Sequence, residues 1–195
     1  MSDVFVIATN NPKKLKEIDA ILKEIGASAI TLREAGISTD PEETGTTFEE
    51  NAFIKAQAAC MASGRPAIAD DSGLEVDALD KAPGIYSARY CEGSDSDRVD
   101  FLLKNMQGVK NRTARFVSAV CCVFPSGEKI TVRGECEGEI THAPAGENGF
   151  GYDPVFYVPE QGSTFAQIPA EIKNTISHRA RALSRLAAEL KKREI

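Results

Sequence analysis

The sequence has no long hydrophobic run. Its longest mostly apolar stretch, residues 116–124, is far shorter than the roughly 20 residues that a helix needs to cross a bilayer. The first residues also lack the basic segment and the apolar core of a secretory signal peptide. We therefore expect a soluble cytoplasmic protein with no membrane partner.

Several site patterns are missing as well. The chain has five cysteines, none spaced as CxxC, and only two histidines; this usage favours free thiols in a reducing compartment over disulfides or zinc. The GxxxxGK[ST] pattern of a Walker loop and the GxSxG elbow of serine hydrolases are absent. These absences argue against a P-loop enzyme and a serine hydrolase.

The chain has no excess of positive charge. Its net charge of −6 argues against a general nucleic-acid partner. The charge is uneven, because residues 34–100 hold 15 acids and 5 bases, whereas residues 171–195 hold 3 acids and 7 bases. A magnesium–nucleotide site needs both carboxylates and cations, although a solvated acidic face and a basic terminal helix would give the same pattern.

Hydrophobic periodicity predicts alternating strands and helices. No linker separates two domains, so we expect an α/β fold over residues 1–195: a single domain with an elongated, mixed, twisted sheet flanked by helices, and two lobes around a nucleotide-binding cleft. The predicted strands are 3–8, 28–32, 67–71, 74–79, a hairpin of 112–124 and 129–141, and 155–158. The predicted helices are 12–26, 47–64, 95–107, and a last one that begins within 174–177 and runs to the end.

The turn after the first strand reads Thr9-Asn10-Asn11-Pro12-Lys13-Lys14. Asn11 suits an N-cap and Pro12 the first helical position. The free N–H groups of a helix start could hold a phosphate, with Lys13 or Lys14 pairing its oxygens. Taken alone, a well-capped helix with surface lysines explains this turn better.

Two pairs of acids could hold a cation. They are Glu42-Glu43 and Asp70-Asp71, and the second pair directly follows the small apolar stretch 67–69. Adjacent acids at the end of a strand are costly without a cation, and Mg²⁺ prefers one or two carboxylates plus water and phosphate oxygens. Asp71 could hold the ion, accept a proton from water, or both; an Asx turn with solvated acids is equally compatible.

Three further groups are weak individually. Asn51 and Lys55 share one face of a predicted helix, but could simply face solvent. Residues 149–154 form a glycine-rich loop in which Phe150 could stack on a purine. Lys173 and the pair His178-Arg179 could donate to a base carbonyl or to phosphate, or lie at a solvated helix start.

Taken together, the residues of these segments and their order along the chain are specific for one protein family. The sequence resembles the ITP/XTP pyrophosphatase family, the house-cleaning purine nucleoside triphosphate pyrophosphatases. The resemblance extends from Thr9 to Leu183 and is carried by TNNPKKLKEI, EETGTTFEENAFIKA, AIADDSGLEVDAL, APGIYSARY, GENGFGYDPVFYVP and KNTISHRARAL.

The resemblance implies an activity and a set of site residues. It implies hydrolysis of ITP, dITP and XTP to the monophosphate and pyrophosphate by a Mg²⁺-dependent homodimer. Asp71 matches the catalytic proton acceptor, and Glu43 and Asp71 match the metal ligands. The substrate-binding positions match Thr9, Asn10, Asn11, Pro12, Lys13, Lys14, Asn51, Lys55, Ser72, Phe150, Gly151, Tyr152, Asp153, Lys173, His178 and Arg179.

Departures from the family pattern are small. Position 10 is Asn where relatives often carry Gly, Lys13 replaces a frequent small residue, and residues 146–149 are less glycine-rich. Two alternatives stay open: a pyrophosphatase that prefers dTTP, UTP or dUTP, and a nucleotide-binding protein without catalysis.

Overall fold

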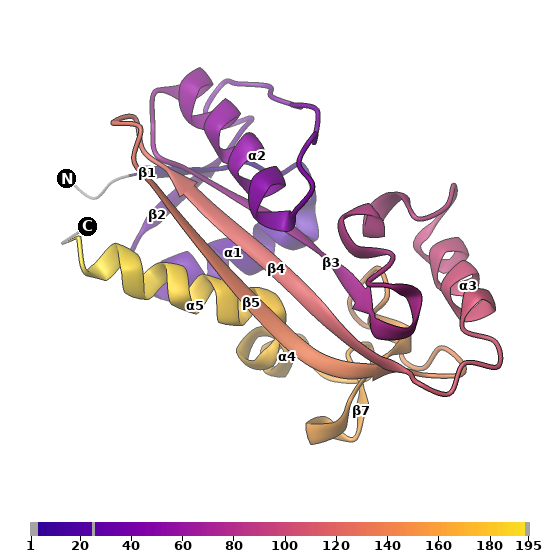
Figure 1. The fold of residues 1–195 in the computed structure, drawn as a ribbon. Helices are drawn as coiled ribbons and strands as arrows, with labels where there is room; N and C mark the ends of the chain where they lie inside the picture. Colours follow the sequence, from indigo (N-terminus) through magenta and orange to yellow (C-terminus); the bar gives the residue numbers. More distant parts are fainter. Residues whose placement is uncertain (1–3, 25, 194–195) are drawn as a thin grey trace. The chain divides into compact units, whose positions relative to one another are not determined.

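One seven-stranded sheet forms the framework of the computed structural model, which describes residues 4–24 and 26–193 (Figure 1). The strand order is β2-β1-β3-β4-β5-β6-β7. β1 (Val4–Ile7) pairs in parallel with β2 (Ser28–Thr31) and β3 (Ala67–Val76). β6 (Phe156–Val158) pairs antiparallel with β5 (Lys129–Ile140) and β7 (Ser163–Thr164). The prediction of a mixed sheet flanked by helices is confirmed.

The predicted hairpin joins β4 (Thr113–Val123) to β5. Its turn is closed by hydrogen bonds from Phe124 N to Glu128 O at 2.9 Å and from Gly127 N to Phe124 O at 2.9 Å. At its other end, Ile140 N donates to Arg112 O at 2.9 Å. Both ends share one register, so the hairpin is paired along its whole length.

The chain contacts divide into two units, and β3, β4 and β5 each contribute residues to both. The first unit comprises the chain up to Asp71, Ser118–Gly134, and the chain from Arg179 onward. The second comprises Ser72–Val117 and Glu135–His178.

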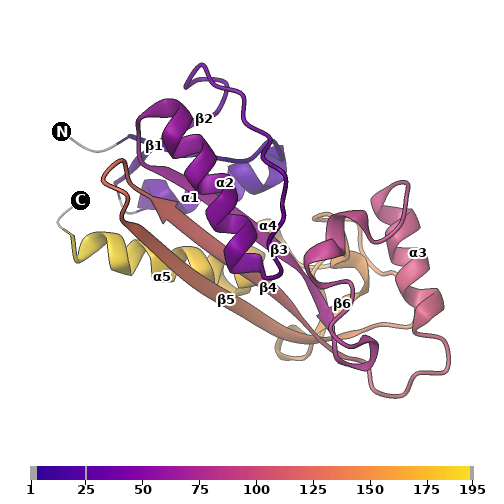
Figure 2. The ribbon, with the colours of Figure 1, turned by 45° about the horizontal axis from the view of Figure 1, so that its top comes forward.

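The first unit has helices on both faces of its strands. α1 (Pro12–Glu24) and α5 (His178–Lys191) lie on one face, and α2 (Phe48–Ser63) lies on the other (Figures 1 and 2). Apolar side chains such as Ile18 of α1 and Leu186 of α5 are fully buried with Ile68 of β3 in one core. These apolar residues recur at helical spacing, so α1 and α5 each bury one face against the sheet.

Capping residues begin and end these helices where the sequence predicts. The Asn11 side chain accepts from Lys14 N at 3.3 Å, and the Thr47 side chain accepts from Glu50 N at 3.1 Å. Gly64 ends α2 in the left-handed conformation, with φ of 65°. Each cap satisfies backbone groups that a helix end leaves without intrahelical partners.

The second unit packs α3 (Asp95–Asn105) and α4 (Ala170–Ile176) with the remaining strand segments. Val99 and Leu102 of α3 join a core that contains Phe116, Phe156 and Phe165. Its short 3₁₀ helices are Asp77–Leu79, Gly84–Arg89, Asp153–Val155 and Pro159–Gln161.

Two predicted boundaries are wrong. Residues 67–71 and 74–79 were expected as separate strands, but Ala67–Val76 is one strand followed by a 3₁₀ turn. The expected last helix is two helices, because Ser177 has extended backbone, with φ of −68° and ψ of 161°. Ile176 consequently packs on the core of the second unit, whereas Leu183 packs in the first.

Among the described residues, no helix is both long and apolar enough to cross a membrane.

Candidate functional site

The first unit holds a buried cluster of charges around Asp70. Lys14 Nζ lies 2.8 Å from Asp70 Oδ2, and Arg179 Nη2 lies 3.3 Å from the same oxygen. Ser118 donates to Asp70 Oδ1 at 2.5 Å, and the Arg179 guanidinium also pairs with Glu17. Asp70 and Arg179 are each only 2% exposed. Such a buried carboxylate is stable only because cations and a hydroxyl surround it.

These neighbours decide the charge of Asp70. Burial alone would raise the pKa of Asp70, but the charges of Arg179 and Lys14 outweigh it and hold that pKa well below its usual value. Burial lowers the pKa of Lys14, and the charge of Asp70 opposes this shift. The arrangement is a buried ion pair in which Asp70 fixes the ammonium of Lys14 and the guanidinium of Arg179.

Asp71 has a different partner because neighbouring side chains of a strand point to opposite faces of the sheet. Its Oδ1 lies 2.8 Å from Lys55 Nζ, and the same ammonium lies 2.8 Å from Glu43 Oε1. Two carboxylates from distant parts of the chain therefore meet at one cation. The sequence predicts Asp70 and Asp71 at the end of a short strand, 67–71; they lie inside the longer strand Ala67–Val76, where adjacent side chains belong to two distinct clusters.

The Glu43–Lys55–Asp71 cluster has the properties of a site for a divalent cation. Burial raises the pKa of Asp71, and the charge of Lys55 offsets only part of that rise. Burial would lower the pKa of Lys55, but its two carboxylate partners raise it overall. Asp71 Oδ2 is buried and has no hydrogen-bond partner among the described residues. An oxygen in this state can accept a cation or a proton.

Asn51 holds the loop that carries Glu43. Its side-chain oxygen accepts from Gly45 N at 2.9 Å, and a Cβ on Gly45 would overlap Asn51. Asn51 is fully buried, so the solvent-facing interpretation of its helix face is wrong. Asn51 and Lys55 do lie one turn apart on α2, where one positions the loop and the other pairs with its acid.

The turn between β1 and α1 is internally ordered. Thr9 Oγ1 accepts from Asn11 N at 3.2 Å, Asn10 is exposed, and Pro12 is the first residue of α1. The side chain of Lys13 lies outside what the structure describes. Lys14 is held by its ion pair with Asp70.

The second unit holds the other predicted positions. Lys173 Nζ and Asp153 Oδ2 form a buried pair at 2.6 Å, and the same oxygen accepts from Phe150 N at 2.8 Å. The Lys173 ammonium lies 5.0 Å from the centre of the Phe150 ring. A Cβ on Gly149 would overlap the Asp153 carboxylate, so this glycine permits the close approach. The loop is thus built tightly around one carboxylate.

Two aromatic contacts complete this group. Tyr152 Oη donates to Ser87 O at 2.8 Å, and burial raises the pKa of the Tyr152 hydroxyl. The buried His178 ring stacks on Phe116, with ring centroids 4.7 Å apart and an interplanar angle of 13°. Ser72 lies in β3 and is partly exposed.

Sequence reasoning missed members of the cluster around Asp70. Asp70 was noticed only as the neighbour of Asp71, although the structure gives it three partners. Glu17 lies one helical turn after Lys14, a spacing that could have linked it to this cluster. His178 and Arg179 were considered as one donor pair, yet one stacks on Phe116 and the other pairs with Asp70.

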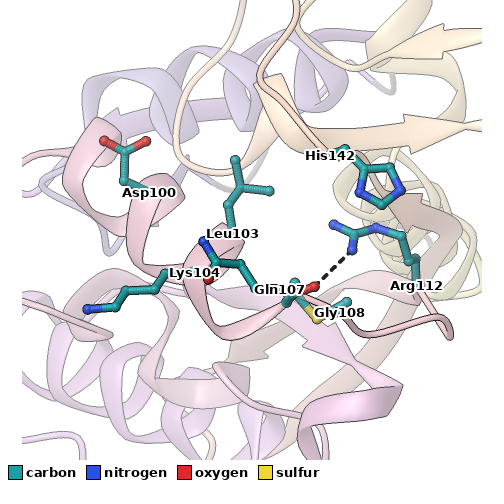
Figure 3. Close-up of a pocket in the computed structure, with 8 residues that line it drawn as sticks. Asp100, Leu103, Lys104, Gln107, Gly108, Arg112 and His142 are labelled. Carbon is teal, nitrogen blue, oxygen red and sulfur yellow. Dashed lines mark hydrogen bonds between the residues drawn. The ribbon is translucent and has the colours of Figure 1, made fainter.

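A separate cavity of about 520 Å³ lies beside the end of α3, and no predicted site residue lines it (Figure 3). Arg112 reaches across it and donates to the carbonyls of Ile140 at 2.5 Å, Met106 at 3.1 Å and Thr141 at 2.7 Å. The guanidinium therefore ties the end of α3 to the end of β5. The role of Arg112 is structural, because its guanidinium donates to backbone carbonyl oxygens.

Comparison with known proteins places this geometry in a family. A dITP/XTP pyrophosphatase of Exiguobacterium sp. is 50% identical over 95% of each chain, and one of Clostridium perfringens is 47% identical over 96% of this chain and 97% of that protein. The structure resembles that of the Staphylococcus aureus Ham1 protein, with a TM-score of 0.89, 43% identity, and coverage of 97% of this chain and 99% of that one.

A Ham1 protein from Coxiella burnetii gives a TM-score of 0.90 at 39% identity, with 98% of this chain and 100% of that one covered. The pattern that defines the Ham1 family matches residues 5–189. The resemblance found in the sequence is confirmed at this level, and the chain belongs to the Ham1 family.

Proposed function

We propose that this protein hydrolyses the triphosphates of non-standard purine nucleosides, namely ITP, dITP and XTP, to the monophosphate and pyrophosphate. The observation that carries the proposal is the meeting of Glu43 and Asp71 at Lys55, close to Lys14. Carboxylates for a cation and lysines for phosphate are the groups that phosphoanhydride hydrolysis requires. Relatives named dITP/XTP pyrophosphatase are 50% and 47% identical to this chain over nearly its whole length.

Glu43 and Asp71 are the residues that would hold Mg²⁺. Within the described part of the chain, no cluster of three or more metal-binding side chains occurs. This composition suits Mg²⁺, which takes one or two carboxylates and completes its shell with water and substrate oxygens. When bound, Mg²⁺ would neutralise phosphate charge and polarise the bond to be broken.

In the first unit, some groups would bind the triphosphate and Asp71 would accept a proton. The N–H groups of the turn before α1 and the ammonium groups of Lys14 and Lys55 would bind the triphosphate oxygens. Asp71 would take a proton from the attacking water, a role that suits a carboxylate whose pKa burial has raised. The water oxygen bonds to the α-phosphorus, the bond to the bridging oxygen breaks, and pyrophosphate leaves.

The groups of the second unit suit the nucleoside. Phe150 offers a ring on which a purine could stack, and Lys173 with Asp153 keeps its loop in place. Hypoxanthine and xanthine carry an oxygen where adenine carries an amino group, so a donor from His178 would pair with the first two and leave adenine badly paired. Such mispairing of a buried group can cost orders of magnitude in rate.

We also propose that the protein works as a homodimer in the cytoplasm. The dimer rests on the family membership, and the compartment rests on a cysteine number and spacing that suit a reducing environment.

A product assay tests the function. Purified protein with Mg²⁺ is incubated separately with ITP, XTP, dITP, ATP, GTP and dUTP, and the nucleotide and phosphate products are resolved. We expect monophosphate and pyrophosphate from the first three and little from ATP or GTP. Turnover of dUTP alone would instead support a pyrimidine-preferring enzyme, and binding of ITP without turnover would support a nucleotide-binding protein.

A further inference from the structure

A side chain from outside the glycine-rich loop holds its backbone in place. Asp95, the first residue of α3, accepts the N–H of Gly151 on its Oδ2 at 2.8 Å. Its Oδ1 accepts from Arg98 Nη2 at 2.7 Å, and Arg98 Nη1 donates to Gly93 O at 2.9 Å. The carboxylate is thus oriented on one side by an arginine and directed at the loop on the other.

The backbone at Gly151 needs such a contact. Gly151 is in the left-handed conformation, with φ of 60°, and a Cβ placed there would meet no atom within 4 Å. Packing around its α-carbon therefore does not fix the conformation, and glycine has more backbone freedom to lose than any other residue. A hydrogen bond to its amide supplies the missing restraint.

Gly151 lies between two side chains whose directions matter. Phe150 precedes it, with its ring beside the Lys173 ammonium, and Tyr152 follows it, with its hydroxyl bound to Ser87 O. A change of φ at Gly151 would turn Phe150 relative to Tyr152. The contact from α3 therefore restrains the backbone directly after Phe150, the ring assigned to the purine.

We propose that Asp95 is a positioning residue for the nucleoside, acting through Gly151 and Phe150. This inference rests on the proposed function, in which Phe150 stacks on the base. Without the carboxylate, the loop would spend less time in the binding conformation, and apparent affinity falls in proportion to that fraction. Asp71, not Asp95, is the residue proposed to act in the step at phosphorus, so loss of the Asp95 carboxylate should leave kcat unchanged.

Kinetics of three variants with ITP test the proposal. We expect Asp95→Ala to raise KM roughly tenfold, the ratio that corresponds to about 1.4 kcal/mol, with kcat unchanged. Asp95→Asn keeps an oxygen that can accept the Gly151 N–H, and its KM should stay near the wild-type value. Asp97→Ala is the matched control, because its carboxylate lies in the same helical turn but bonds to Ser94; its KM should not change.

Amide exchange of Gly151, measured by NMR on the free protein, gives a readout that does not depend on activity. Asp95→Ala should speed this exchange, whereas Asp95→Asn and Asp97→Ala should not. An unchanged KM and unchanged exchange in folded Asp95→Ala protein would overturn the inference. Wild-type protein that leaves ITP intact would overturn the proposed function instead, and the exchange data would still report whether Asp95 restrains the loop.

Discussion

At the scale of single residues, the proposed function depends on two adjacent aspartates whose pKa values shift in opposite directions. Asp70 is surrounded by Lys14, Arg179 and Ser118, so its charge is fully compensated. Asp71 has one cation partner and one buried oxygen without a partner among the described residues. The low pKa of Asp70 keeps it ionised beside its cations, whereas Asp71 has an oxygen that could accept a cation or a proton.

Replacing Asp71 by Asn should therefore remove catalysis without unfolding the protein. We expect kcat with ITP to fall by a factor on the order of 100 or more, the range for loss of a general base. Steady-state kinetics give the rate, and the melting temperature reports whether the variant is folded. A folded variant with nearly normal kcat would remove Asp71 from the chemistry.

A charge-removing change at Glu43 tests the metal assignment. Glu43→Gln should raise the Mg²⁺ concentration for half-maximal rate by about tenfold or more, since even changes beyond the direct ligands cost that much affinity. Its neighbour gives the control: Glu42 makes no ion pair in the described part of the chain, so Glu42→Gln should leave the Mg²⁺ dependence as it was. Equal Mg²⁺ curves for both variants would contradict the assignment.

At the scale of elements, hydrophobic period and capping residues predicted most helices and strands. They failed at β3, which was expected to end at Asp70 and Asp71 but continues through both acids to Val76. Partners far away in sequence, such as Lys14 and Arg179, make burial of these acids possible, and local pattern contains no information about them. The break at Ser177 was missed for a similar reason, because the two helices pack on different cores.

The contact between α3 and β5 depends on Arg112. Arg112→Met keeps much of the apolar stem but removes its hydrogen bonds to four backbone carbonyls, so we expect a loss of roughly 2–4 kcal/mol in the free energy of unfolding. Lys104→Met, in the wall of the same cavity, should change it by less than about 0.5 kcal/mol. Urea denaturation gives the free energy of unfolding of both variants. Equal values would show that Arg112 does not stabilise the contact between α3 and β5.

At the scale of the whole molecule, composition and charge restricted the class of protein, but the family resemblance supplied the activity. The sites predicted from sequence fall into two groups, around Asp71 in the first unit and around Asp153 in the second. Short segments drew attention to these residues, and the family resemblance assigned their roles. The contacts of Asp70 with Arg179 and of Asp95 with Gly151 join residues distant in sequence, so the local sequence pattern does not predict them.

The oligomeric state is a property of the same scale. We expect sedimentation velocity at micromolar concentration to give a homodimer, with twice the 21.0 kDa mass of one chain. A single species at 21.0 kDa over the working concentrations of the assay would contradict the proposed dimer and leave the reaction to one chain.

Hydrolysis of ITP in ¹⁸O-labelled water tests the central claim most directly, because it reports both the products and the phosphorus that is attacked. The account predicts IMP and pyrophosphate, with the label in IMP, since the water oxygen joins the α-phosphorus. Label in pyrophosphate, or release of IDP and phosphate, would contradict it.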